Sequence, residues 1–534
     1  MKARDLVGTG SLIRLALRRD RIKLSAWLLG ISGFVWIATG VNAAFSPEEM
    51  VAIVLLATEN PAMRFLVSPI RADSVTEVSR FVFLRFSFVF SLLTALMSIQ
   101  AVTRHTRWSE EAGCAEMIGA SVTGRYAGLA SAMAVGLGAN VVLALLIGAA
   151  LGAHGLPVAG SLAAGASFGG LGIAFTGIAA VAVQLSGTSS GANGIGGMAF
   201  GATFALTGMA NAMGRSHAGG LGFESAGLAW ISPMSWTQRF YPFDDANWWI
   251  LALFLLFFIV CAVLSVDLVA RRDVGRGVLA DRRGRPRASV WLCCPLGVAW
   301  RLQRGSLFSW AFPMVFMGLM LGASAESLGE TMGATEAFGG AFSQAIAEFP
   351  FLVIGVAASG VAIYAMKAVL RMRREEDGGP LETVLSTPVK RATFVTSHVA
   401  CGLAGSFVLV QLFALAQAAA MRGAGTPLAE FLVAAAYQSV GVLVLVGFVL
   451  ALYGLLPGAS GPVSLVVVLA AIATGPFFGT ALDLPEWLTN LSPFSHIAFM
   501  PGEVRGLTIL LLASVGAALG FAGYVGFSRR NVPA

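Results

Sequence analysis

The sequence predicts an all-α polytopic membrane protein with twelve transmembrane helices, arranged as two parallel six-helix repeats. Three observations lead to this prediction: the composition, the spacing of the apolar runs, and short stretches that recur in both halves. The 534 residues are 57% hydrophobic and only 12% charged, whereas soluble domains average about 25% charged residues. A chain this long and this poor in charge cannot cover itself with polar surface, which excludes an ordinary soluble fold.

Apolar runs long enough to cross a bilayer, about 20 residues each, occur twelve times. In the first half they lie near residues 23–44, 80–102, 127–152, 161–185, 192–213 and 248–270. In the second half they lie near residues 305–325, 347–369, 393–421, 429–455, 461–482 and 506–527. The 64 glycines suit closely packed membrane helices.

Residues 10–24 precede the first span and predict an amphipathic helix that lies along the cytoplasmic interface. One helical stripe carries basic side chains and another carries apolar ones, namely Arg14, Arg18 and Arg21 against Ile13, Leu17 and Leu24. A basic flank also fits a cleaved signal peptide. Because the first span has a counterpart later in the chain, we interpret it as retained.

The basic residues predict the orientation. Lys and Arg gather before the first span, in the segment 271–304, after the second span of each half and at the end of the chain, whereas acidic residues gather in the opposite loops. By the positive-inside rule both termini are cytoplasmic in a multi-pass protein of the plasma (inner) membrane. The net charge of +7 is thus a topology signal rather than a nucleic-acid patch.

Four short stretches of the first half recur in the same order in the second half. "RIKLSAW" is echoed by "RGSLFSW", the loop after the second span recurs, "ISPMSW" is echoed by "LSPFSH", and "ARRDV" is echoed by "SRRNV". An even number of spans in each half gives the copies parallel topology about a pseudo-two-fold axis along the membrane normal. The predicted organisation is a first half at 1–270, a basic cytoplasmic linker at 271–296 and a second half at 297–534.

The recurring loops are "EEAGCAEMIGASVTGR" and "EEDGGPLETVLSTPVKR". Each has an acidic pair, a glycine, a further glutamate and a basic residue nine positions later. They are too short for a catalytic domain and hold no plausible Cys–His or Ser–His pair, so we interpret them as short cytoplasmic helices that dock on a two-fold partner. The alternative is a solvated hairpin with no docking role, which the presence of the pattern in both halves disfavours. The candidate docking residues are Glu110, Glu111, Glu116, Arg125, Glu375, Glu376, Glu382 and Arg391.

These loops, together with "LRRDRIKLSAW", "ENPAMR", "RHTRWSEEAG" and "SPMSWTQRFYPF", resemble the permease subunits of actinobacterial antibiotic exporters of the tetronasin type, within the ABC-2 (type V) exporters. The resemblance covers essentially the whole chain and is most specific in the loop with its "RHTRWSEEAG" entry. It implies coupling helices near 108–125 and 374–391 that sit in clefts of two copies of a separate ATPase, which binds ATP and Mg²⁺. It also implies efflux of antibiotics or drugs along a path lined mainly by the second and fifth spans.

The two loops depart from each other at Val122, where the second loop has Pro388, and at Ala120-Ser121, where it has Ser386-Thr387. The equivalence of the two docking sites is therefore open.

The chain is not expected to be an enzyme by itself. A P-loop needs a lysine that follows a glycine, and none of the four lysines does: Lys2, Lys23, Lys367 and Lys390. ATP hydrolysis would have to come from another polypeptide. The five cysteines show no CxxC spacing and the five histidines are scattered, so no metal site is expected.

One rival interpretation is a proton-coupled drug transporter of the major facilitator type. "GVLADRRGRPR" resembles a loop signature of those twelve-span proteins, but there it follows the second span and here it follows the sixth. Proton coupling also usually needs an intramembrane charge, and no Asp or Glu lies near the middle of a predicted span. A membrane scaffold or enzyme is a third class, for which no catalytic constellation is visible.

The candidate path for a small apolar or amphipathic substrate is aromatic. Phe81, Arg85 and Phe88 share one stripe of the second span, and the other candidates are Phe200, Phe204, Phe351, Phe477 and Phe478. Arg85 could snorkel outward, pair with an acid such as Glu348 or face the path. Aromatic stripes of this kind also face lipid or neighbouring helices. The outer segments 224–248 and 483–503 predict short helices that close the exit, with ordinary interfacial anchors as the alternative.

Overall fold

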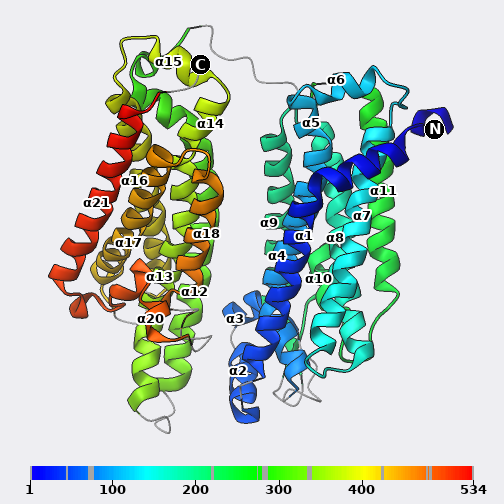
Figure 1. The fold of residues 1–534 in the computed structure, drawn as a ribbon. Helices are drawn as coiled ribbons and strands as arrows, with labels where there is room; N and C mark the ends of the chain where they lie inside the picture. The colour runs from blue at the N-terminus through cyan, green and yellow to red at the C-terminus, as the bar shows by residue number, and fades with distance from the viewer. Residues whose placement is uncertain are drawn as a thin grey trace. The chain divides into compact units, whose positions relative to one another are not determined.

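The computed structural model describes residues 3–43, 46–59, 61–69, 77–217, 222–273, 275–279, 287–333, 340–421, 426–476, 479 and 484–531. The chain divides into two compact units, Met1–Gly284 and Arg285–Ala534. Helices dominate both units (Figure 1), which confirms the all-α prediction. Each unit is described by itself.

The first unit carries six long helices joined by short elements. In chain order its elements are η1 (Ala3–Leu6), α1 (Thr9–Asn42), α2 (Pro47–Glu59), α3 (Pro61–Leu66), α4 (Val78–His105), α5 (Arg107–Glu111), α6 (Cys114–Gly119), α7 (Ala127–Gly152), α8 (Val158–Leu185), α9 (Ser189–Ala212), β1 (Arg215–Ser216), β2 (Phe223–Glu224), η3 (Gly227–Ile231), α10 (Pro233–Gln238) and α11 (Ile250–Arg271). The strands β1 and β2 pair antiparallel, with Arg215 opposite Glu224.

The second unit has a similar order of long and short helices. Its elements are η4 (Val290–Cys293), α12 (Pro295–Gly333), α13 (Gly340–Val369), α14 (Arg371–Asp377), α15 (Pro380–Leu385), α16 (Arg391–Ala420), α17 (Leu428–Leu455), α18 (Ser460–Ala473), α20 (Glu486–Thr489), η6 (Pro493–His496), η7 (Pro501–Glu503) and α21 (Gly506–Arg529).

Ten helices among the described residues are long and apolar enough to cross a membrane, which confirms a multi-pass membrane protein. The two other predicted spans correspond to α9 and α18. The helix α9 has 24 residues but is rich in Gly, Ser and Asn. The 14 residues of α18 reach about 21 Å at 1.5 Å per residue, short of the hydrocarbon thickness of about 30 Å. The count of twelve therefore stays a prediction.

Residues 10–24, which the sequence assigns to the interfacial helix, form the first part of α1. That helix runs through 34 residues without a break and measures about 51 Å. Because this exceeds the hydrocarbon thickness, part of α1 lies outside the apolar layer in any upright placement.

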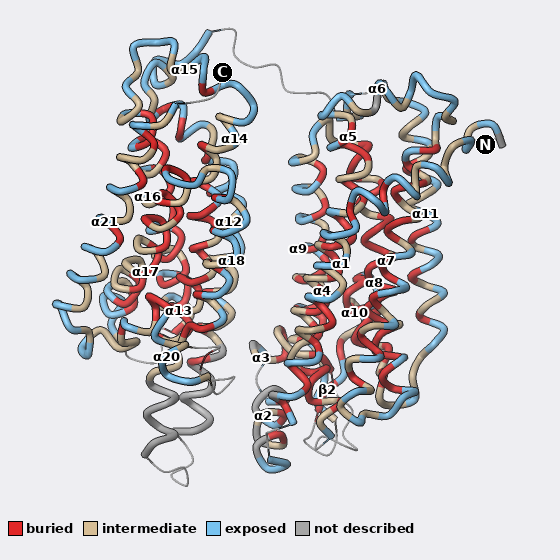
Figure 2. Tube along the Cα trace, in the orientation of Figure 1, coloured by how far each residue is buried: buried red, intermediate tan, exposed pale blue. Residues whose placement is uncertain are grey.

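In the first unit α8 is the central helix, with α4, α7, α9 and α11 packed around it. Close approach depends on small residues: a Cβ at Gly165 would lie 2.0 Å from the carbonyl oxygen of Ala144. The buried Asn140 of α7 then joins three helices, since its Nδ2 donates to Ser98 Oγ at 3.0 Å and to Thr176 Oγ1 at 3.3 Å. Figure 2 shows buried residues concentrated on α4 and α8, with α11 largely exposed.

In the second unit α17 takes the corresponding central place, with α13, α16, α18 and α21 as neighbours. Its contact with α21 is built on glycines spaced seven apart. A Cβ at Gly447 would lie 2.2 Å from the carbonyl oxygen of Gly516, and one at Gly454 would lie 2.0 Å from that of Gly523. The two backbones therefore touch directly, as in other small-residue helix pairs of membranes.

The long helices of the two units have the same neighbours in the same order. The first helix packs on the second and third (α1 on α4 and α7, α12 on α13 and α16), and the fourth packs on the sixth (α8 on α11, α17 on α21). In each unit the recurring loop lies at one end, beside the last turn of the sixth helix, and the outer segment lies at the other end (Figure 1).

Candidate functional site

Both recurring loops fold as two short helices separated by a sharp turn. In the first loop, α5 and α6 are separated by Gly113 with φ of 71°, and in the second, α14 and α15 are separated by Gly379 with φ of 87°. Glycine adopts this left-handed conformation without the strain that a Cβ would add. Glu116 and Glu382 lie in the first turns of α6 and α15, where a carboxylate is favoured by the helix dipole.

A buried ion triad ties the first loop to the end of α11. Glu110 contacts Arg107 and Arg272, each at 2.8 Å. The side chain of Arg107 is fully buried and also donates to the carbonyl oxygens of Val183 and Arg276. Since Arg272 directly follows α11, the loop and the sixth helix of this unit are held together by charge-assisted hydrogen bonds.

A second triad has the same design in the other unit. Glu376, whose side chain is 3% exposed, contacts Arg530 at 2.6 Å and Arg373 at 3.4 Å. Arg530 directly follows α21. Arg373 is shared, because its other nitrogen contacts Asp377 at 2.9 Å.

The two basic residues predicted for docking also point toward their own chain. Arg125 donates to the carbonyl oxygens of Val269 and Ala270 at 3.1 and 3.2 Å. Arg391 donates to the carbonyl oxygens of Ser528 and Arg530 at 3.2 and 2.7 Å. Each guanidinium thus caps the C-terminal end of a sixth helix, where the last carbonyls have no partner within the helix. A docking role for these two residues stays a prediction.

The contacts of the acidic residues agree with the register in which the sequence comparison places Val122 opposite Pro388. By their contacts, Glu110 corresponds to Glu376 rather than to Glu375. Glu375 pairs with Arg371 at 3.5 Å. Glu111 accepts hydrogen bonds from the backbone nitrogen of Ser189, at 2.8 Å, and from its hydroxyl. The first loop is therefore also attached to the N-terminal end of α9.

Sequence reasoning missed the internal partners of the loops. These are Arg107, Arg272, Arg373, Arg530 and Ser189. A signal for four of them was present: an arginine stands three positions before the paired glutamate in each loop, and the echoes "ARRDV" and "SRRNV" supply the other two. For Ser189 no comparable signal exists.

The outward surfaces of the loops differ. Glu116 and Glu382 are both exposed. Beside Glu116, Met117 is 72% exposed and Val122 is 89% exposed. The matching positions in the second loop are Thr383 and Pro388, also exposed. Only the first loop therefore presents a methionine next to its glutamate.

The predicted substrate-path residues of the first unit form two groups. Phe88 of α4 lies against Phe204 and Phe200 of α9, with ring centroids 4.2 and 6.3 Å apart, and Phe65 of α3 adds a contact with Phe204 at 5.5 Å. The helices α4 and α9, which the sequence predicts as the second and fifth spans, therefore meet through these rings.

Phe81 and Arg85 lie elsewhere on α4. Phe81 is fully buried in a small cluster with Met50 and Val54. The guanidinium of Arg85 lies 5.4 Å from the Phe81 ring centroid and donates to Asn42 Oδ1 of α1 at 3.0 Å. The pairing of Arg85 with Glu348 stays a prediction.

The remaining path candidates belong to the second unit. Phe351 of α13 is buried and stacks on Phe431 of α17 at a centroid distance of 5.4 Å. Phe477 and Phe478 lie outside the described residues.

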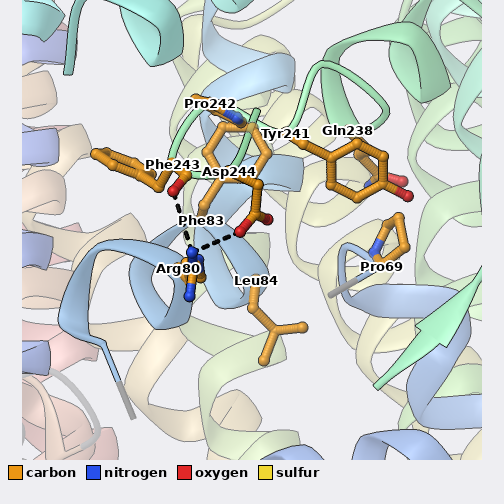
Figure 3. A pocket seen from close by; sticks show the side chains of 9 residues that line it. All are labelled: Pro69, Arg80, Phe83, Leu84, Gln238, Tyr241, Pro242, Phe243 and Asp244. Carbon is orange, nitrogen blue, oxygen red and sulfur yellow. Dashed lines mark hydrogen bonds and ion pairs between the residues drawn. The ribbon is translucent and has the colours of Figure 1, made fainter. Parts of the chain in front are cut away.

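The outer segment of the first unit is fastened to α4 and α9. Arg80 contacts Asp244 at 2.5 Å and donates to the carbonyl oxygen of Phe243 at 3.2 Å (Figure 3). The recurring stretches "ISPMSW" and "LSPFSH" each contain a serine that makes the same kind of hydrogen bond. The buried Ser232 donates to the carbonyl oxygen of Thr203, and the buried Ser492 donates to that of Ala471, both at 2.8 Å. The short helices predicted in 224–248 and 483–503 are present, whereas closure of an exit stays a prediction.

Long apolar helices in both units define an all-helical, multi-pass membrane protein. The chain is 34% identical over 542 residues to the multidrug efflux system permease protein Rv1217c of Mycobacterium tuberculosis (strain ATCC 25618 / H37Rv), across 98% of this chain and 95% of that protein. Residues 292–528 match the family model described as multidrug efflux system permease Rv1217c, C-terminal domain. The chain therefore belongs to this family of multidrug efflux system permeases. The comparisons give the major facilitator interpretation no support.

Proposed function

We propose that this chain is the membrane-spanning permease subunit of an ATP-driven ABC-2 (type V) exporter that moves apolar or amphipathic compounds, such as antibiotics, out of the cell. The observation that carries the proposal is the duplicated loop: both copies have the same helix–glycine–helix geometry and the same attachment to the end of a sixth helix. A docking element presented twice suits two copies of one partner. In this proposal the partner is a separate ATPase that holds ATP and Mg²⁺.

The proposed topology has twelve spans in two parallel halves with both termini in the cytoplasm, and the membrane is the plasma membrane. The matched order of helix neighbours in the two units supports it, as do the four sequence echoes and the basic residues gathered at the loop ends. In this topology α9 and α18 are the fifth spans, and the two loops are coupling helices near 108–125 and 374–391.

The contacts of the loops support a route for the motion. When two ATPase subunits close on ATP, the coupling helices that they hold are drawn together. Through Glu110 and Arg272 the first loop acts on α11, and through Glu111 it acts on the start of α9. Displacement of α9 changes its contact with α4, where Phe88 meets Phe200 and Phe204. These apolar rings suit an apolar substrate and form the proposed path in this unit.

The test is copurification of the permease from its native membrane, followed by an ATPase assay on the eluate. We expect about two ATPase chains per wild-type permease and their loss or uncoupling in Glu116→Ala/Glu382→Ala. The matched control is Glu48→Ala/Glu486→Ala, since these glutamates are exposed and belong to α2 and α20, at the ends of their units away from the loops (Figure 1).

An unchanged complex and unchanged activity in Glu116→Ala/Glu382→Ala would contradict the docking role of the loops. A wild-type permease that purifies alone, without ATPase activity, and that moves a dye in response to a proton gradient would contradict the exporter proposal and favour the facilitator type.

A further inference from the structure

A cavity of about 610 Å³ lies in the first unit between the first part of α1, the first loop and the nearby ends of α7 and α11. This volume is within the range of ligand pockets, about 300–1,000 Å³. Apolar side chains line one part of it, among them Leu12 and Leu15 of α1 and Leu129 of α7. Arg19, Arg125 and Arg272 line the rest. The cavity is therefore amphipathic, with a cationic part and an apolar part.

Two of the three guanidinium groups have neutral hydrogen-bond acceptors. Arg19 donates to the carbonyl oxygen of Arg104 at 3.2 Å and to Ser109 Oγ at 3.4 Å, and it contacts His105 Nδ1 at 3.1 Å. Arg125 donates to the two carbonyl oxygens at the end of α11. Within the described part of the chain neither guanidinium group is paired with a carboxylate, so each keeps a positive charge that an anion could balance.

The carboxylates at the cavity do not cancel this charge. Glu110 is engaged by Arg107 and Arg272 in the triad. Asp273 also lines the cavity and is exposed. Its single negative charge is smaller than the two positive charges of Arg19 and Arg125. The lining therefore keeps a positive excess next to an apolar surface.

We propose that this cavity binds an anionic phospholipid of the inner leaflet, with the phosphate held between Arg19 and Arg125 and the start of an acyl chain against Leu12 and Leu15. A phosphate suits the forked guanidinium groups, and basic pockets beside membrane helices on the cytoplasmic side recognise anionic headgroups. In the topology proposed above, on which this inference rests, the first part of α1 lies at the cytoplasmic face, where the acyl chain of an inner-leaflet lipid begins. Because the lipid would contact the first loop directly, its occupancy would link membrane composition to the coupling helix.

The corresponding cavity of the second unit has a different lining. It measures about 560 Å³ and lies between η4, α12 and the second loop. Cys293, Cys294, Glu375 and His398 supply polar atoms there, and the residues that line it in the described part of the chain include no arginine. Phe394 occupies the position that matches Gly128 of the first cavity. The proposal is therefore specific to the first unit.

The test is binding of a fluorescent short-chain phosphatidylglycerol to the purified full-length permease in a neutral maltoside detergent, followed by fluorescence anisotropy. Phosphatidylcholine with the same chains is the comparison ligand. We expect phosphatidylglycerol to bind at least tenfold more tightly, and we expect Arg19→Gln/Arg125→Gln to remove this preference. The control is Arg14→Gln/Arg18→Gln, which removes the same charge from two residues of α1 that do not line the cavity.

A second variant fills the cavity without any change of charge. Gly128 lines the cavity and a Cβ there would meet no atom within 4 Å, so we expect the ring of Gly128→Phe to enter the cavity. Gly138→Phe is its control, because Gly138 lies on the same helix, is exposed and is equally free of neighbours. We expect Gly128→Phe to weaken phosphatidylglycerol binding at least tenfold and Gly138→Phe to leave it unchanged.

Three results would overturn the proposal. Equal binding of phosphatidylcholine would remove the role of the anion. Competition by millimolar inorganic phosphate as strong as that by phosphatidylglycerol would show a phosphate site that does not need the lipid. Full binding to Gly128→Phe would place the lipid elsewhere. All these measurements use the permease alone, so their failure would leave the exporter proposal intact.

Discussion

The first and second loops share one fold but differ in the long helices to which their acidic side chains are attached. The first loop is joined to two long helices, to α11 through Arg272 and to α9 through Ser189. The second loop is joined to α21 through Arg530, while its Asp377 pairs with Arg373 of the same short helix. The comparison teaches that the geometry of a docking element and its mechanical connections are separate properties. In the first unit the loop can act on both the fifth and sixth helices.

The largest difference in stability between the two loops is expected when the glutamate of each triad is lost. Glu110→Gln leaves the fully buried Arg107 and the nearly buried Arg272 without a carboxylate, and breaking such a buried pair costs about 3–5 kcal/mol. Glu376→Gln releases Arg530 and the more exposed Arg373, which keeps Asp377, so about half that loss is expected. Thermal unfolding of both variants in the same detergent measures the difference. Equal melting temperatures would show that the triads are equivalent.

The second-largest difference is expected in how the exposed surfaces of the two loops contribute to affinity for the ATPase. If the ATPase covers Met117, its truncation in Met117→Ala removes about 1.5 kcal/mol of apolar burial, or roughly tenfold in affinity. Thr383→Ala, at the matching position, should change the affinity less than threefold. A titration of the purified ATPase against each permease variant measures both effects. A larger effect of Thr383→Ala than of Met117→Ala would show that the exposed surface of the second loop contributes more to docking.

The helix-capping arginines provide a smaller contrast. Arg391→Gln removes charge-assisted bonds to the last carbonyls of α21, and Arg125→Gln removes those to α11. Each change should destabilise its sixth helix by about 1–2 kcal/mol, with the larger loss at Arg391, whose bond to the Arg530 carbonyl is the shortest at 2.7 Å. Amide hydrogen exchange in the last turns of α11 and α21 reports each loss locally. Unchanged exchange in both turns would show that these contacts do not hold the helix ends.

The smallest expected effect concerns the link between the first loop and α9. Glu111→Gln weakens the interaction with Ser189 at a helix N-terminus, which is worth about 0.3–1 kcal/mol at an exposed site. Faster exchange is expected at the first amides of α9, with Asp377→Asn as a control that leaves α18 unchanged. Equal protection of α9 in Glu111→Gln and the wild type would remove the proposed route from loop to fifth helix.

Much of the architecture could be predicted from the sequence, because apolar length and charge excess report directly on a membrane environment. The helical class and most spans follow from the runs alone. The runs at 192–213 and 461–482 also located the fifth helices, α9 and α18. That these two cross the membrane stays a prediction, since α9 mixes glycine and polar residues with its apolar ones, and α18 ends at Ala473, just before Gly475 and Pro476. The position of a helix in a bundle can compensate for an apolar content that is too low in isolation.

The location of the loops was predictable, but the roles of their residues were not. The pattern of Glu, Gly and Arg marked both loops, yet a sequence cannot tell an outward carboxylate from one held by a distant arginine. Glu110 and Glu376 are paired with residues that follow the sixth helices, more than 150 residues away. Only the folded chain distinguishes them from Glu116 and Glu382, which are exposed.

The equal length of the two loops has a practical consequence. From Arg107 to Arg125 and from Arg373 to Arg391 the chain takes the same number of residues, whereas the connection between the first and second long helices holds α2 and α3 in one unit and only a few residues, 334–339, in the other. One added residue in a loop would turn the following helix by about 100° and misdirect its capping arginine. An epitope tag or a fluorescent reporter for tracking this transporter in cells therefore belongs in the connection between α12 and α13, whose length differs from that of the matching connection in the first unit, and not in either loop.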